Sequence, residues 1–303
     1  MKYLDELIAT AKALPQKRTI AVCGADDEHV VSMVLEAVGS GLCNAILVGD
    51  AAKILEYGAG RYPQEIGIVD EKDRVASCRR AVELVHNGQA QVFVKGLVNT
   101  RDFLHAVLDK EVGLRSGRQL NVLSAYEIPG QEKLLFLADG GMMVAPTLEE
   151  KAEILRSCVP VLHQLGIQEP KVAILAANEQ VSPKMQATVD AAKLVEMAKA
   201  GELPHGIYEG PMAFDVIMRK EAAQIKGIDS QVSGDADLIL VPTIETGNSL
   251  GKAIGYFGKG VMAGIVVGAT HPVIMSSRAA KSKTKIASIA WAILAYKQEE
   301  EEK

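Results

Sequence analysis

Aromatic side chains are scarce in this sequence, at 4% of 303 residues with a single tryptophan. Proteins that bind single-stranded nucleic acids stack bases on aromatic rings and concentrate positive charge to neutralise phosphates. Here the formal net charge is −5, and the basic residues are dispersed along the chain. We therefore expect no nucleic-acid partner.

Disulfide and metal-binding patterns are also missing. The cysteines at 23, 43, 78 and 158 form no CxxC pair and lie in apolar surroundings, and the six histidines show no HExxH spacing. This pattern predicts reduced, buried thiols and no metal site.

No apolar stretch is long and uninterrupted enough to span a bilayer, and the amphipathic first residues carry acids, unlike a signal peptide. The sequence therefore predicts a cytoplasmic protein without a membrane partner. Nucleotide motifs are absent too. "GNSLGKA" (247–253) misses the P-loop spacing by one residue, and "GKGVMAG" (258–264) precedes a strand instead of following one.

Short apolar runs alternate with longer segments of helical period. Near-continuous apolar strands are typical of a parallel sheet covered by helices on both faces. The predicted strands are 18–25, 44–50, 65–70, 91–97, 171–177, 205–210, 236–242 and 264–268. An antiparallel hairpin is predicted over 120–139, where "PGQ" joins two strand-like runs and marks the passage to a second domain. Both halves are predicted to be open α/β units.

In open α/β sheets, ligands collect beyond the carboxyl ends of the strands. Glycine and hydroxyl residues there suit anions, because the first N–H groups of a helix lack internal partners. The candidates at predicted strand ends are Lys95; Glu209, Gly210 and Pro211 with Asp215; Gly247 and Asn248; and Ser277 and Arg278. Each turn taken alone is also explained by ordinary helix capping.

With those turns in place, the chain resembles the phosphate acetyl/butyryl transferase family, in particular its butyryltransferase branch. The resemblance covers essentially the whole length. It rests on the order of "VFVKGLVNT", "GLRSGRQLNVLSAYEIPG", "LLFLADGGMMVAP", "EGPMAFD", "PTIETGN" and "PVIMSSRAAKSKTKIASIA".

The resemblance implies a fold like that of the isocitrate and isopropylmalate dehydrogenases, with two α/β domains flanking a cleft. The implied first domain is 1–127 completed by 264–303, and the second is 128–263. The implied reaction exchanges CoA and inorganic phosphate on a short-chain acyl group, with CoA as a substrate and no cofactor. A homodimer or larger homo-oligomer is also implied.

By the same resemblance, Ser277 assists the transition state and Arg278 binds phosphate. Arg115, in "GLRSG", is a weaker candidate for a second phosphate or CoA contact. Gly247 and Asn248 match the family's Gly-Asn loop, and Glu209, Gly210 and Pro211 match its Asp-Gly-Pro turn.

One departure concerns the general base. Acetyltransferase relatives carry a carboxylate seven residues after the serine, where this chain has Thr284. Either Glu209 or Asp215 accepts the thiol proton, or nearby lysines lower the pKa of the CoA thiol. Those lysines, at 281, 283 and 285, are equally explained as the solvated side of the last helix.

Two other functions stay open at this stage. Loss of the carboxylate at Thr284 fits a catalytically silent protein that binds acyl-CoA. A metal- and NAD-dependent decarboxylating dehydrogenase would need clustered aspartates at the cleft, but Asp235 and Asp237 come just before the apolar run "LILVP" (238–242) and so lie at the wrong end of the predicted strand.

Overall fold

The structure, a computed structural model, describes residues 3–275 and 282–296. Ser277 and Arg278 lie outside the described residues. The chain forms two compact units: a first unit of Leu4–Arg118 and Ala263–Lys303, and a second unit of Met1–Tyr3 and Gln119–Met262. The domain limits expected at 127/128 and 263/264 stay predictions.

The first unit is built on a mostly parallel sheet in the order β3-β2-β1-β4-β11-β10. Only β10 runs antiparallel to its neighbour β11. The strands are β1 Thr19–Cys23, β2 Asn44–Gly49, β3 Ile66–Asp70, β4 Val92–Lys95, β10 Val261–Val267 and β11 Val273–Ile274. The apolar β1, β2 and β4 are buried almost throughout. The prediction of parallel strands from apolar runs is therefore confirmed here.

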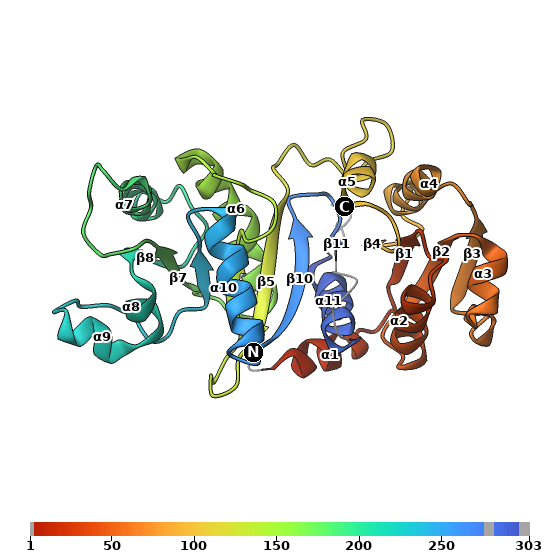
Figure 1. Cartoon of the computed structure of the whole chain (residues 1–303), viewed down its shortest axis with the longest axis horizontal. Helices are drawn as coiled ribbons and strands as arrows, with labels where there is room; N and C mark the ends of the chain where they lie inside the picture. The colour runs from red at the N-terminus through yellow and green to blue at the C-terminus, as the bar shows by residue number, and fades with distance from the viewer. Residues whose placement is uncertain (1–2, 276–281, 297–303) are drawn as a thin grey trace. The chain divides into compact units, whose positions relative to one another are not determined.

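Helices cover both faces of this sheet (Figure 1). The chain passes from β1 through α2 to β2 and through α3 to β3, and then returns through α4 to β4. Because parallel crossovers are right-handed, α4 lies on the opposite face from α2 and α3. The helices of this unit are α1 Leu4–Lys12, α2 Glu28–Gly39, α3 Ala51–Glu56, α4 Arg74–His86, α5 Thr100–Val107 and α11 Ser282–Ala295, with a 3₁₀ turn at Ala59–Arg61.

The second unit has the strand order β5-β6-β9-β7-β8. Its strands are β5 Asn121–Glu127, β6 Leu135–Ala138, β7 Lys171–Leu175, β8 Ile207–Met212 and β9 Leu238–Leu240. Antiparallel β5 and β6 confirm the predicted hairpin, and β6, β9, β7 and β8 run parallel. The chain is thus a mixed α/β protein.

The helices of the second unit are α6 Leu148–Gln164, α7 Gln186–Lys199, α8 Phe214–Met218, α9 Lys220–Ile225 and α10 Ile244–Tyr256. The helices α8 and α9 are separate, because Arg219 between them is extended. Among the described residues, no helix combines the length and apolar character needed to cross a bilayer.

Two predicted turns are not turns. Glu209, Gly210 and Pro211 lie inside β8, where the register with β7 shifts and accommodates a proline that has no N–H to donate. Gly247 and Asn248 lie inside α10, because Thr243 caps that helix four residues before Gly247. The expected loop at 247–248 is therefore the second turn of a helix.

Candidate functional site

The strand order of the first unit reverses between β1 and β4. The chain leaves β1 toward β2, whereas β4 lies on the other side of β1. A crevice forms at such a switch point, outside the carboxyl ends of the strands, and it is the usual ligand site of this architecture. Cys23 and Lys95 are the last residues of β1 and β4, and they lie side by side in the register. The structure thus places predicted Lys95 at the switch point.

Gly96 brings the two strand ends into close contact. Its amide donates to the Cys23 carbonyl (3.0 Å), and the next amide, of Leu97, donates to the Gly24 carbonyl (2.8 Å). A Cβ at Gly96 would lie 2.3 Å from the Cys23 oxygen and 2.6 Å from the Gly24 oxygen. Only glycine fits here, because both neighbours are backbone atoms.

Replacement of Gly96 by alanine is expected to lower the free energy of unfolding by about 1–3 kcal/mol, the usual cost of forcing an atom into a packed interior. The matched control is Gly255→Ala in α10, where an added Cβ meets nothing within 4 Å. That change is expected to be neutral or slightly stabilising, because alanine favours helix. Urea unfolding of both variants measures the difference, and equal stabilities would contradict the close approach.

Charged and thiol groups surround the switch point. Arg74, at the start of α4, forms a bidentate pair with Asp26, with N–O distances of 2.5 and 2.8 Å. Burial raises the pKa of the Cys23 thiol well above its ordinary value. A hydrogen bond from Cys23 lowers the pKa of the Cys78 thiol. The positive charges of Lys95 and Arg74 lower this pKa further. All four cysteines are free and buried, as predicted.

β11 adjoins β4 on the side away from β1. Val273 and Ile274 pair in parallel with Phe93 and Val94. The chain therefore passes Met275 beside the Lys95 end of β4 and then enters 276–281, which holds Ser277 and Arg278. The described part of β11 thus leads toward the edge that carries Lys95.

Arg115 lies at the other end of β11. Its backbone bridges Ala269, in the link between β10 and β11, and the Thr270 amide donates to the Leu114 carbonyl (2.9 Å). This link precedes β11, whereas Ser277 and Arg278 follow it. The side chain of Arg115 is exposed.

In the second unit, the carboxyl ends of β6 and β9 are adjacent, and Asp139 follows β6 directly. Asp139 is 2% exposed. The carboxylate accepts three backbone hydrogen bonds, from Val122 (2.9 Å), Gly141 (2.6 Å) and Met142 (2.9 Å). The sequence analysis did not single out Asp139, although an aspartate followed by two glycines at a strand end is a typical turn signal.

The two carboxylates proposed as alternative bases are both engaged. Glu209 accepts from the Ser230 hydroxyl and from the Gln231 amide (2.8 Å). Asp215 is paired with Lys226 (3.0 Å), and that hydrogen bond holds the pKa of Asp215 below its ordinary value. A depressed pKa makes a carboxylate a weaker proton acceptor.

Thr284 does not supply a carboxylate and is itself buried in the first turn of α11. Its backbone carbonyl accepts from the Ser288 hydroxyl (2.9 Å). The preceding residue, Lys283, pairs with Asp5 at 3.1 Å and is partly exposed.

A buried ion pair lies near the carboxyl ends of β7 and β9. Lys151 of α6 and Asp190 of α7 are 2.6 Å apart, with side chains 7% and 6% exposed. Gln186 donates to the other Asp190 oxygen (2.7 Å). Sequence reasoning missed this pair, because both residues sit inside amphipathic helices and are 39 positions apart.

A cavity of about 410 Å³ opens at the amino ends of the strands in the second unit, away from the edge where ligands are expected. Lys133 pairs there with Asp235 (2.7 Å) and Asp237 (2.6 Å). Burial raises the pKa of Asp235, but Lys133 and Lys171 outweigh it, so that pKa lies below its ordinary value. These aspartates therefore serve as ion-pair partners. No cluster of three or more metal-ligating side chains occurs in 3–275 and 282–296.

The first unit is thus an open α/β domain with a lysine, Lys95, at the switch point of its sheet. A family model for phosphate acetyl/butaryl transferases matches residues 69–293, and the chain belongs to that family.

Its relatives cover nearly the whole chain. The phosphate butyryltransferase of Clostridium acetobutylicum is 40% identical over 97% of this chain and 98% of its own length. The phosphate acetyltransferase of Thermotoga maritima is 36% identical over 95% and 98%. The crystal structure of a branched-chain phosphotransacylase from Enterococcus faecalis superposes with a TM-score of 0.83 at 29% identity, covering 92% and 99%.

Proposed function

We propose that this chain catalyses the exchange of CoA and inorganic phosphate on a short-chain acyl group, converting acyl-CoA and phosphate to acyl phosphate and CoA. A phosphate oxygen bonds to the acyl carbonyl carbon, the carbon–sulfur bond breaks, and the CoA thiolate takes up a proton. The observation that carries the proposal is the match over nearly its full length to a phosphate butyryltransferase at 40% identity.

The switch point of the first unit supports a phosphate site. Lys95 ends β4, and β11, which pairs with β4, ends three positions before Ser277 in the sequence. We assign Arg278 to phosphate, because its planar fork of donors matches phosphate oxygens. We assign Ser277 as hydrogen-bond donor to the oxyanion that forms on the acyl oxygen.

The other predicted residues differ in how well the structure supports them as substrate contacts. A substrate contact by Gly247 and Asn248 is supported by their position in α10, the helix that follows the carboxyl end of β9. A structural role is favoured for Glu209 and Asp215, because both carboxylates already have hydrogen-bond or ion-pair partners. It is also favoured for Gly210 and Pro211, because both lie inside a strand. Arg115 keeps the weaker assignment to phosphate or CoA.

No general base is needed in the direction of acyl phosphate synthesis, because phosphate already presents ionised oxygens at neutral pH. The reverse reaction needs a CoA thiolate. Since Glu209 and Asp215 are both engaged, we propose that positive charge near the thiol lowers its pKa, which favours the thiolate without a carboxylate base.

We further propose that the acyl group is butyryl or a branched group of similar size, as the names of the butyryl and branched-chain relatives suggest. One or two methylenes change binding by about 1–3 kcal/mol, so acetyl-CoA is expected to react more slowly and not to be excluded.

The finer fold assignments belong to the same proposal. We propose a fold like that of the isocitrate and isopropylmalate dehydrogenases, with domains divided at 127/128 and 263/264. We also propose that the protein is a cytoplasmic homo-oligomer and uses no cofactor. Sedimentation equilibrium of the purified protein tests the oligomer, and a monomer at micromolar concentration would contradict it.

The deciding experiment measures free thiol released from acetyl-, propionyl-, butyryl- and isobutyryl-CoA, with phosphate present or replaced by sulfate at equal ionic strength. We expect release that requires phosphate, fastest with a four-carbon acyl group. Release without phosphate would indicate a thioesterase. Tight binding of butyryl-CoA by calorimetry without any turnover would indicate the silent binding protein that the missing carboxylate at Thr284 allows.

A further inference from the structure

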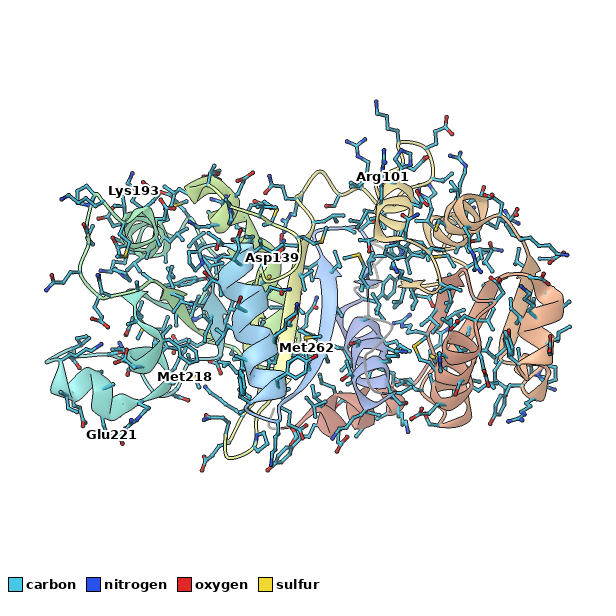
Figure 2. All side chains as sticks on the ribbon, viewed as in Figure 1. Arg101, Asp139, Lys193, Met218, Glu221 and Met262 are labelled. Carbon is cyan, nitrogen blue, oxygen red and sulfur yellow. The ribbon has the colours of Figure 1, made fainter. Side chains whose placement is uncertain are left out.

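We propose that Asp139 is a positioning residue that fixes the start of α10, and with it Asn248, for substrate. The inference rests on the proposed function, because Asn248 is one of its substrate contacts. Figure 2 shows Asp139 among the elements of the second unit, close to α10.

The Asp139 carboxylate organises the turn after β6. One oxygen accepts from the amides of Gly141 and Met142, and the other accepts from Val122 of β5. Since Asp139 is 2% exposed, water does not compete for these bonds. An ionised acceptor makes stronger hydrogen bonds than a neutral one. The carboxylate thus ties the turn both to itself and to the neighbouring strand.

The residues on either side of this turn hold the beginning of α10 by backbone hydrogen bonds. The Ile244 amide, one of the first N–H groups that a helix leaves without an internal partner, donates to the Val144 carbonyl (3.0 Å). At the end of β9, the Val241 amide donates to the Ala138 carbonyl (2.8 Å). The approach to α10 is therefore fastened on both sides of Asp139.

Two contacts reach the second turn of α10. The Asn248 side-chain amide donates to the Gly140 carbonyl (3.4 Å). A Cβ at Gly247 would lie 2.6 Å from the Gly140 Cα and 3.1 Å from the Asp139 carbonyl oxygen, so the helix touches the turn backbone to backbone. A shift of the 139–142 turn is therefore transmitted directly to Asn248.

Asp139→Asn is the sharpest test because it keeps the size of the side chain. In the variant, the side-chain NH₂ of asparagine faces one of the backbone N–H groups, so one hydrogen bond is lost. The loss of one such bond changes an equilibrium constant by about tenfold. The expected results are about a tenfold loss in kcat/KM for butyryl-CoA and faster amide exchange at residues 244–248. The matched control is Asp109→Asn in the first unit. The carboxylate of Asp109 also accepts hydrogen bonds from two backbone amides (2.8 and 3.0 Å).

A double-mutant cycle separates positioning from plain stability. In an Asn248→Ala background, Asp139→Asn is expected to change kcat/KM less than about twofold, because the side chain that it positions is already gone. The same loss in both backgrounds would overturn the proposal. Should Asp139→Asn not fold, Gly247→Ala disturbs the same contact from the helix side and replaces it in the cycle.

Amide exchange keeps this inference separate from the proposed function. If the wild-type protein shows no phosphate-dependent thiol release, the proposed function fails, while faster exchange at 244–248 in Asp139→Asn still supports the positioning of α10. Unchanged exchange there, with the thermal midpoint of unfolding lowered no more than by Asp109→Asn, would overturn the inference even if the enzyme is active.

Discussion

Ser277→Ala is expected to lower kcat by about 10²- to 10³-fold, the usual effect of removing one donor to a developing oxyanion. KM for acyl-CoA is expected to change little, because the hydroxyl gains most of its interaction as negative charge accumulates on the acyl oxygen. The measurement is phosphate-dependent thiol release from butyryl-CoA under saturating phosphate.

The matched control for this prediction is Ser282→Ala. Ser282 is a hydroxyl close by in the chain, at the start of α11, and it donates to Glu36. Its exposed position makes a large kinetic effect unexpected. Similar losses in both variants would mean that the segment tolerates no change, and an unchanged kcat in Ser277→Ala would remove the assignment of Ser277.

Phosphate recognition separates the roles of Ser277 and Arg278. Loss of Arg278 should raise KM for phosphate as well as lower kcat, and Arg278→Lys should restore only part of the rate because an ammonium cannot bind two oxygens side by side. Arg79→Ala offers a comparison, since Arg79 is half exposed and pairs with Asp109 and Glu111. That arginine lies in an ordinary surface ion network, so its loss should leave KM for phosphate unchanged.

The sequence predicts elements better than contacts. The apolar runs at 18–25, 44–50 and 91–97 correspond to β1, β2 and β4, because buried strands need continuous apolar sequence. The hairpin over 120–139 was also predicted correctly, from the "PGQ" turn between two strand-like runs. Gly247 was placed in a loop because it matches the family's Gly-Asn loop, but it lies inside α10, where its missing Cβ allows the helix to touch the backbone of Gly140.

The site was less predictable for a physical reason. The position of Lys95 could be predicted because it ends a strand, and the order of parallel strands then brings it to the switch point. Asp139 and the Lys151–Asp190 pair depend on partners that come close only after folding. Glu209 has the sequence of a site residue, but Ser230 and Gln231, about twenty positions away, occupy its carboxylate. A single sequence carries no periodic signal for such pairings.

Asp190→Ala is expected to lower the free energy of unfolding by about 3–5 kcal/mol, the largest effect on stability that we predict. The substitution leaves the ammonium of Lys151 buried without its carboxylate, in surroundings where both side chains are more than nine-tenths buried. It also leaves Gln186 without the oxygen to which it donates. Urea unfolding followed by circular dichroism measures the change.

The double variant Lys151→Met with Asp190→Leu shows whether that loss comes from the stranded charge. Taking two ions out of water is costly, so replacing both with apolar side chains of similar volume is often neutral or stabilising. The double variant should therefore recover most of the stability that Asp190→Ala loses. If it is as unstable as the single variant, packing of α6 against α7 and not charge is the cause. If Asp190→Ala itself costs less than about 1 kcal/mol, Lys151 reaches water in solution and the buried pair is not a major source of stability.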